Sequence, residues 1–149
     1  MAIQVGDKAP DIKSPEFSLV GLKGQRVVVF FFPKADTPGC TKEACEFRDA
    51  QKKFTKSNAA IVGISPDKAA AHEKFAAKYG LPFTLVPDPE HSIAEAYGVW
   101  KEKSMYGRKY MGIERTTFVI DEKGKIAEVF PKVKPAGHAA EVLEALAKK

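Results

Sequence analysis

Two cysteines that lie five residues apart are the groups in this sequence best suited to chemistry. Cys40 and Cys45 belong to the segment FPKADTPGCTKEAC, whose start continues an apolar run typical of a buried strand. Thr37 can cap a helix and Pro38 suits the first helical position, so we expect Cys40 in the first turn of a helix. Free backbone N–H groups and the helix dipole favour an anion there, which would make Cys40 a thiolate nucleophile.

A helix end supplies only part of what such a nucleophile needs. The dipole stabilises an anion by about 0.3–1 kcal/mol, so we expect a cationic partner for the Cys40 sulfur as well. Two alternatives stay open at this point. In the first, Cys40 is no nucleophile but a small buried apolar side chain. In the second, Cys45 is an incidental cysteine on a charged helix face.

The spacing of the two cysteines limits how they can act together. In an intact helix their Cα atoms are about 8.6 Å apart, whereas a disulfide needs roughly 4.4–6.8 Å. If Cys40 and Cys45 bond, the start of the helix must therefore unwind, and helix ends open at low cost.

The elements that must position the cysteines alternate in type along the chain. Strand, helix, strand, helix, strand, then a hairpin and a closing helix predict one α/β domain over residues 1–149. The run 27–32 is apolar throughout, so helices should cover both faces of the sheet. This order fits a thioredoxin-like fold with a central mixed sheet, although periodicity alone does not separate it from other small α/β sandwiches. The predicted strands are 27–32, 60–65, 84–86, 116–121 and 125–130, with an extra one at 17–22, and the predicted helices are 41–56, 65–79, 92–97 and 136–148.

Composition and charge exclude several other classes of protein. The chain has 149 residues, of which 44% are hydrophobic and 29% charged, which is ordinary for a globular domain. The net charge of +5 comes without a run of like charges, so we expect no nucleic-acid partner. The longest apolar run is far too short to span a bilayer and the N-terminus lacks the features of a secretory leader, so we expect a cytoplasmic location and no membrane partner. No exposed apolar stripe is evident, which favours a monomer.

The remaining candidate groups do not form a second site. Two cysteines are too few for a disulfide scaffold, and with three scattered histidines they lack the spacing of a zinc site. No nucleotide-binding motif is present, so we expect neither a metal nor a cofactor. His72 is expected to pack in the core, His91 and His138 to be exposed, and the basic residues of 101–109 to form a solvated loop. Three aromatic side chains are expected to wall one side of the site: Trp100, Tyr106 and Tyr110.

The cysteine segment resembles that of the peroxiredoxins of the bacterioferritin-comigratory-protein subfamily, also called the Q type. The family pattern Pro-x-x-x-Thr-x-x-Cys is present as Pro33, Thr37 and Cys40, and the second cysteine of the subfamily stands five residues on as Cys45. Phe32 is a small departure, since relatives often carry Tyr there. The resemblance extends over nearly the whole chain through the segments 5–10, 99–107 and 111–121, the last of which contains Arg115.

This resemblance implies a thioredoxin-like fold and a thiol peroxidase that reduces hydrogen peroxide and organic hydroperoxides. It implies that Cys40 is the peroxidatic cysteine and Cys45 the resolving one, with an intramolecular disulfide that thioredoxin or a similar dithiol reduces. Thr37 and Arg115 would hold the peroxide and the thiolate, and Pro33 would shield the site. Arg115 would then be the cation that the helix end alone does not supply.

Two other functions compete with a peroxidase. A thioredoxin-type thiol–disulfide oxidoreductase would use the same fold, but the sequence lacks the Cys-x-x-Cys motif of that class. A non-catalytic binding domain could carry the two cysteines as redox sensors. Peroxide-dependent turnover separates a peroxidase from both.

Overall fold

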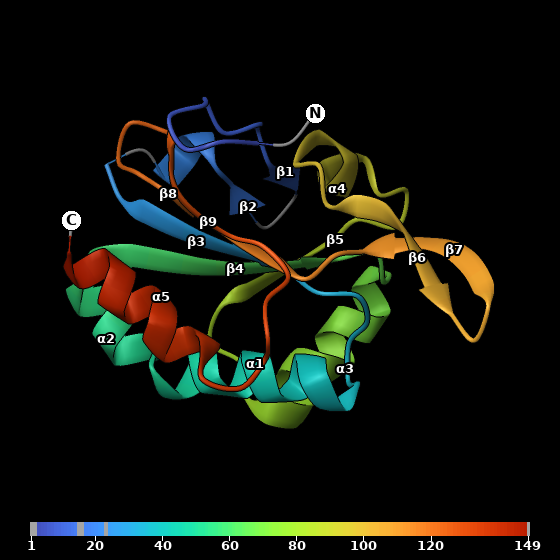
Figure 1. The fold of residues 1–149 in the computed structure, drawn as a ribbon. Coiled ribbons are helices and arrows are strands. Elements are labelled where there is room, and N and C mark those ends of the chain that lie inside the picture. Colours follow the sequence, from blue (N-terminus) through green and yellow to red (C-terminus); the bar gives the residue numbers. More distant parts are fainter. Residues whose placement is uncertain (1–2, 15–16, 23, 149) are drawn as a thin grey trace.

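A central five-stranded sheet forms the frame of the molecule in a computed structural model that describes residues 3–14, 17–22 and 24–148 (Figure 1). Its strands are β3 Arg26–Phe31, β4 Ala59–Ser65, β5 Thr84–Pro87, β8 Thr116–Ile120 and β9 Ile126–Phe130. They follow the order β5-β4-β3-β8-β9. β3, β4 and β5 are parallel, whereas β8 is antiparallel to β3 and to β9. The predicted mixed sheet is therefore confirmed.

β3 is the buried centre of this sheet because its side chains are apolar on both faces. Val27, Val29 and Phe31 pack into one core cluster, and Val28 and Phe30 pack into the other. All five are at most 1% exposed. Successive side chains of a strand point to opposite faces, so an unbroken apolar run is what a strand covered on both faces requires.

Helices and a small N-terminal hairpin cover the two faces of the sheet. They are α1 Pro38–Asp49, α2 Gln51–Lys56, α3 Ala69–Tyr79, α4 Ser92–Ala96 and α5 His138–Ala147, with the strands β1 Lys13–Ser14 and β2 Phe17–Ser18. α1, α2, α3 and α5 lie on one face, and α4 with the β1–β2 hairpin lies on the other (Figure 1). Helices on both faces were predicted, and the structure confirms them. Among the described residues, no helix has the length and apolar character needed to cross a membrane.

The long helix predicted over 41–56 is two helices in the structure. The chain turns at Ala50, whose φ and ψ angles are −95° and 4°, so α1 ends and α2 begins there. Periodicity does not reveal this turn, because Phe47 and Phe54 pack into the same core cluster on either side of it.

Two further segments have limits that differ from the prediction. α3 begins at Ala69, later than predicted, because the bend before it serves another contact: the Asp67 carboxylate accepts a hydrogen bond from the Ala35 N–H at 2.6 Å. The segment predicted as a strand over 17–22 holds only the short β2, which the 3₁₀ helix η1 (Val20–Leu22) follows.

A further hairpin, which the sequence did not reveal, projects from the body of the molecule (Figure 1). It consists of β6 Trp100–Met105 and β7 Arg108–Ile113, paired antiparallel. Positive φ angles at Tyr106 (53°) and Gly107 (78°) form the tight turn between them. The prediction of a solvated loop over 101–109 is wrong, because these residues form two paired strands. The strands were missed because charged residues occupy both faces of the hairpin and no apolar alternation marks them.

Candidate active site

The carboxyl end of β3 and the start of α1 hold the predicted nucleophile. Thr37 has an extended backbone and is the N-cap residue of α1, with Pro38 next to it. The Thr41 N–H donates to the Thr37 carbonyl oxygen at 2.8 Å, which closes the first turn around Cys40. The cap is made by the backbone, because the Thr37 hydroxyl donates instead to the Lys34 carbonyl oxygen at 2.9 Å. The prediction that Cys40 lies in the first helical turn is confirmed.

The Cys40 sulfur meets a guanidinium group from a distant part of the chain. Cys40 is 1% exposed, and Arg115 Nη2 donates a hydrogen bond to its Sγ atom at 3.2 Å. Arg115 stands directly before β8, which pairs antiparallel with β3 so that Thr116 lies opposite Phe31. This register brings Arg115 to the end of β3 at which Cys40 lies.

Arg115 is enclosed by the start of α1 and by the loop between β9 and α5. A Cβ atom at position 39 would come within 3.3 Å of Nη2, so Gly39 leaves room for the guanidinium beside Cys40. The Arg115 carbonyl oxygen accepts a hydrogen bond from the Val133 N–H at 2.8 Å, and Pro135 packs against Gly39. The loop thus closes one side of the site.

Sequence reasoning missed Glu43, the third member of this network. Its side chain is fully buried and its Oε1 atom accepts a hydrogen bond from Arg115 Nη1 at 2.8 Å, while its Oε2 atom has no hydrogen-bond partner among the described residues. Burial raises the pKa of Glu43 to about 7, against the opposing effect of the Arg115 charge. Glu43 follows Cys40 by three residues, which puts both on neighbouring positions of one helix face. A carboxylate next to the apolar positions of the helix is the signal that could have found it.

Arg115 holds its charge between two acidic groups. Burial acts to lower the pKa of Arg115, but the charges of Cys40 and Glu43 outweigh burial and raise it. An arginine does not lose its proton in a protein and presents its donors in a fixed geometry. The sulfur is therefore next to a permanent positive charge.

Cys45 lies on the same helix in different surroundings. Both cysteines are free thiols, but Cys45 is partly exposed whereas Cys40 is buried. Cys45 lines an open surface hollow that Asp36 and Tyr79 also line. Arg48 is near enough for its charge to interact with that of Cys45. Because α1 is intact between the two cysteines, a disulfide between them requires the start of α1 to unwind.

Pro33 and Phe32 connect β3 to the loop that leads to Cys40. Phe32 is fully buried, and its N–H donates to the Ile64 carbonyl oxygen at 3.0 Å, which extends the pairing of β3 with β4. Pro33 is half-buried and has no N–H to continue that pairing. Its role as a shield of the site stays a prediction.

The structure corrects the prediction for His138, which is buried and not exposed. Its ring packs edge-on against Phe47 and Phe130, and its Nε2 atom is 2.7 Å from Thr117 Oγ1. Gly137 has a φ angle of 80°, and this left-handed turn directs His138 inwards at the start of α5. Burial lowers the pKa of His138.

The other histidines make structural contacts, whereas the aromatic residues near the hairpin differ in their surroundings. His72 is buried as predicted, with Nε2 hydrogen-bonded to Ser65 Oγ. His91 is half-buried rather than exposed, because its ring stacks on Trp100 with 3.9 Å between the ring centres. Tyr106 does not wall the site as expected, since it is 98% exposed at the tip of the hairpin. In the part of the chain that the structure describes, no three histidine, cysteine or acidic side chains gather as metal ligands.

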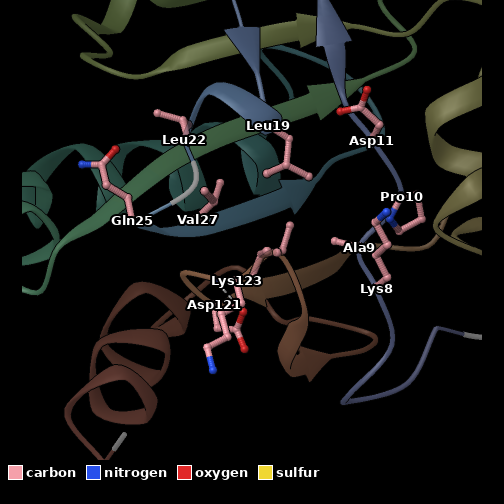
Figure 2. Close-up of a pocket in the computed structure, with 12 residues that line it drawn as sticks. Lys8, Ala9, Pro10, Asp11, Leu19, Leu22, Gln25, Val27, Asp121 and Lys123 are labelled. Carbon is pink, nitrogen blue, oxygen red and sulfur yellow. Dashed lines mark hydrogen bonds between the residues drawn. The ribbon is translucent and has the colours of Figure 1, made fainter.

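A hollow of about 410 Å³ lies away from this site (Figure 2). Leu19, Leu22 and Val27 are among its apolar walls, and Lys8 and Lys123 are among its charged ones. It lies at the end of β3 opposite to the cysteine loop. Among the described residues that line it there is no thiol, so it offers no counterpart of the Cys40 nucleophile.

Comparison with known proteins identifies the family of this chain. Residues 5–129 match the model of the AhpC/TSA family. The chain belongs to this family. A relative named peroxiredoxin Bcp, from Bacillus subtilis (strain 168), is 46% identical over 151 residues, which cover 98% of this chain and 96% of the relative.

Solved structures of other peroxiredoxins resemble this AhpC/TSA-family chain over most of its length. A mutant of Xylella fastidiosa PrxQ has a TM-score of 0.91 at 36% identity and covers 99% of this chain and 98% of its own. The bacterioferritin comigratory protein of Xanthomonas campestris, described for its alkyl peroxide reduction activity, has a TM-score of 0.85 at 41% identity and covers 89% of this chain and 84% of its own. The predicted thioredoxin-like fold and the resemblance to Q-type peroxiredoxins are confirmed.

Proposed function

We propose that this peroxiredoxin is a thiol peroxidase in which Cys40 reduces hydroperoxides, Cys45 resolves the oxidised product and a dithiol protein restores both thiols. The observation that carries the proposal is the contact of Arg115 Nη2 with the Cys40 sulfur at 3.2 Å, in the first turn of α1. The relative named peroxiredoxin Bcp and the alkyl peroxide reduction described for the Xanthomonas campestris protein support a peroxide as the substrate.

In the first step, the Cys40 thiolate attacks the outer oxygen of the hydroperoxide. An S–O bond forms and the O–O bond breaks, so the sulfur becomes a sulfenic acid while an alkoxide or hydroxide leaves and takes a proton from solvent. Arg115 stabilises the thiolate and the charge on the leaving oxygen. The Thr37 hydroxyl donates to the Lys34 carbonyl, so its lone pairs stay available for the peroxide hydrogen. Pro33 shields the reacting atoms from solvent.

In the second step, Cys45 condenses with the Cys40 sulfenic acid. An S–S bond forms, the S–O bond breaks and water leaves with the proton of the Cys45 thiol. The start of α1 has to unwind first, because positions five apart in a helix are too distant for a disulfide. The pairing of Glu43 with Arg115 joins this turn to β8, so it is one of the contacts that unwinding disrupts.

In the third step, an external dithiol, most simply thioredoxin, reduces the disulfide and becomes a disulfide itself. Each peroxide thus consumes the two electrons of one dithiol. The first two steps use residues of one chain, so a monomer suffices for them. The cycle needs a compartment that keeps thiols reduced, for which the cytoplasm is the natural choice.

Two cysteine-to-serine variants test this cycle. Cys40→Ser removes the nucleophile, so NADPH oxidation coupled through thioredoxin reductase and thioredoxin should fall by more than about 1,000-fold. Cys45→Ser should keep the first oxidation of Cys40 and lose thioredoxin-dependent turnover. Retained turnover in Cys40→Ser would overturn the mechanism, and full turnover in Cys45→Ser would show that Cys45 is not the resolving thiol.

Mass spectrometry of the wild-type protein supplies the direct readout. After one equivalent of hydrogen peroxide, the protein should lose two hydrogens and yield a cross-linked peptide that contains Cys40 and Cys45. A protein that stays reduced under these conditions would contradict a peroxidase.

A further inference from the structure

The hairpin of β6 and β7 carries a half-buried lysine, Lys103, whose charge interacts with those of Arg115 and Cys40. Lys101 and Lys103 are two residues apart on β6 and therefore share one face of the hairpin. On that face, Lys101 Nζ binds Glu114 Oε2 at 2.8 Å, and Glu114 directly precedes Arg115. The face that bears Lys103 is thus the one turned towards the Arg115 end of β8.

The Lys103 side chain is half-buried and crosses the partner strand. Lys103 is paired in register with Tyr110, and its Cδ atom lies 3.4 Å from where a Cβ atom on Gly112 would be. Because Gly112 has no side chain, the lysine stem has room to pass over β7 towards Glu114 and Arg115.

The charges that act on Lys103 show what its ammonium group faces. Burial lowers the pKa of Lys103 and the positive charge of Arg115 lowers it further, whereas the charges of Cys40 and Glu114 raise it. Within the described part of the chain Lys103 forms no ion pair, since Glu114 is taken by Lys101. A half-buried ammonium group that feels the repulsion of a guanidinium is unfavourable unless an anion offsets that repulsion.

The formal charges of the site show that a Cys40 thiolate needs a second cation to balance it. Arg115 is shared between Glu43 and Cys40. Above pH 7, where Glu43 is ionised, the net charge of the Arg115–Glu43 pair is therefore zero. A Cys40 thiolate then leaves one negative charge without a partner. Lys103 supplies the missing positive charge.

We propose that Lys103 is a positioning residue that raises the positive potential at the Cys40 sulfur and so favours anions there. These anions are the thiolate itself and the oxygen that leaves the peroxide. The catalytic part of this inference rests on the proposed function, whereas the potential at the sulfur does not depend on it.

The ratio of two alkylation rates measures this potential. Iodoacetate is an anion and iodoacetamide is its neutral counterpart. Because both react with the thiolate, the ratio of their rate constants does not depend on how much thiolate is present. In a Cys45→Ser background only Cys40 reacts. Lys103→Met should lower the iodoacetate-to-iodoacetamide ratio about three- to tenfold at low salt, and Lys103→Arg should restore it.

Lys109→Met is the matched control, because Lys109 is an exposed lysine of the same hairpin that pairs with Glu102 at 3.7 Å. An unchanged ratio in Lys103→Met, or an equal fall in Lys109→Met, would overturn the inference. A lower ratio with an unchanged rate of Cys40 oxidation by hydrogen peroxide would overturn the positioning role. If peroxide failed to oxidise Cys40 while the ratio still depended on Lys103, the proposed function would fail and the charge effect would stand.

Discussion

Cys40 and Cys45 lie on one helix, but their surroundings differ in almost every physical respect. Cys40 is 1% exposed, packs in the cluster that contains Ala44 and Phe47, and accepts a hydrogen bond from Arg115. Cys45 is partly exposed in an open hollow, near surface charges that water screens. The buried side suits a reaction that fixed charges stabilise, and the open side suits a thiol that has to move.

The contacts that hold α1 follow the same division. Towards the sheet, the buried Glu43 is bound to Arg115 at 2.8 Å. Away from it, Arg48 Nη1 donates to the Tyr79 carbonyl oxygen at 2.7 Å across a partly exposed boundary with α3. We expect the buried contact to control the chemistry of Cys40, and the buried and exposed contacts together to set the ease with which the helix unwinds.

Replacing Arg115 tests the buried side of this comparison most severely. Arg115→Gln removes the permanent charge beside Cys40 and leaves the buried Glu43 without its partner. The second-order rate constant for oxidation of Cys40 by hydrogen peroxide should fall about 100- to 1,000-fold, as measured by stopped-flow fluorescence of Trp100. Arg108→Gln, at an exposed arginine of β7, is the control that should keep the wild-type rate. A fall in Arg115→Gln no larger than that of the control would remove Arg115 from the mechanism.

Glu43→Gln tests the buried side of α1 through the pH dependence of stability. Burial raises the pKa of Glu43 from its ordinary 4.5 to about 7. Between these values the folded protein binds a proton that the unfolded chain has lost, so the free energy of unfolding of the wild type falls as the pH rises through this window. Glutamine does not ionise, so the stability of Glu43→Gln relative to the wild type should rise over the same window by up to about 3 kcal/mol.

Urea unfolding of both proteins below pH 4.5 and above pH 7 measures this difference. Glu144→Gln, at an exposed position of α5, should show no such pH dependence. A difference between Glu43→Gln and the wild type that stays constant across the window would mean that burial does not shift the Glu43 carboxyl.

Tyr79→Phe probes the open side, where the expected effect is smallest. The Tyr79 hydroxyl donates to Asp36 Oδ1 at 2.8 Å and so ties the loop before α1 to the end of α3. Without this exposed hydrogen bond the helix start should open more readily, and the disulfide between Cys40 and Cys45 should form about twofold faster after peroxide treatment. Acid quenching followed by mass spectrometry gives the rate.

Tyr106→Phe is the control for that experiment, because Tyr106 is 98% exposed at the far end of the hairpin. An equal acceleration in both variants would show that the hydroxyl lost from Tyr79 does not restrain the helix. A slower reaction in Tyr79→Phe would mean that the tie to Asp36 assists disulfide formation.

Local features of the sequence predicted the elements that carry the nucleophile. The apolar run 27–32 marks a strand covered on both faces, and Thr37 with Pro38 marks the start of α1, so both are present as predicted. Each of these signals acts within one turn or one strand, where propensity and burial agree.

Other parts of the structure left no comparable signal. The break at Ala50 keeps the apolar face of the helix continuous, so periodicity does not indicate it. The β6–β7 hairpin has no apolar face that would indicate its strands. His138 looked exposed because its burial depends on Phe47, Phe130 and the turn at Gly137, which lie in three separate parts of the chain.

Residues close to Cys40 in the chain are enough to place it at the start of a helix after a buried strand, because capping and apolar burial are properties of neighbouring residues. The charges that surround the Cys40 sulfur, in contrast, come from distant parts of the chain and depend on how these parts pack. The register between β3 and β8 brings in Arg115, and the packing of α1 buries Glu43. The pairing of β6 with β7 holds Lys103 where its charge interacts with that of Cys40. Charges act across space and not along the chain, so their effect on Cys40 follows from distances that only the folded protein establishes.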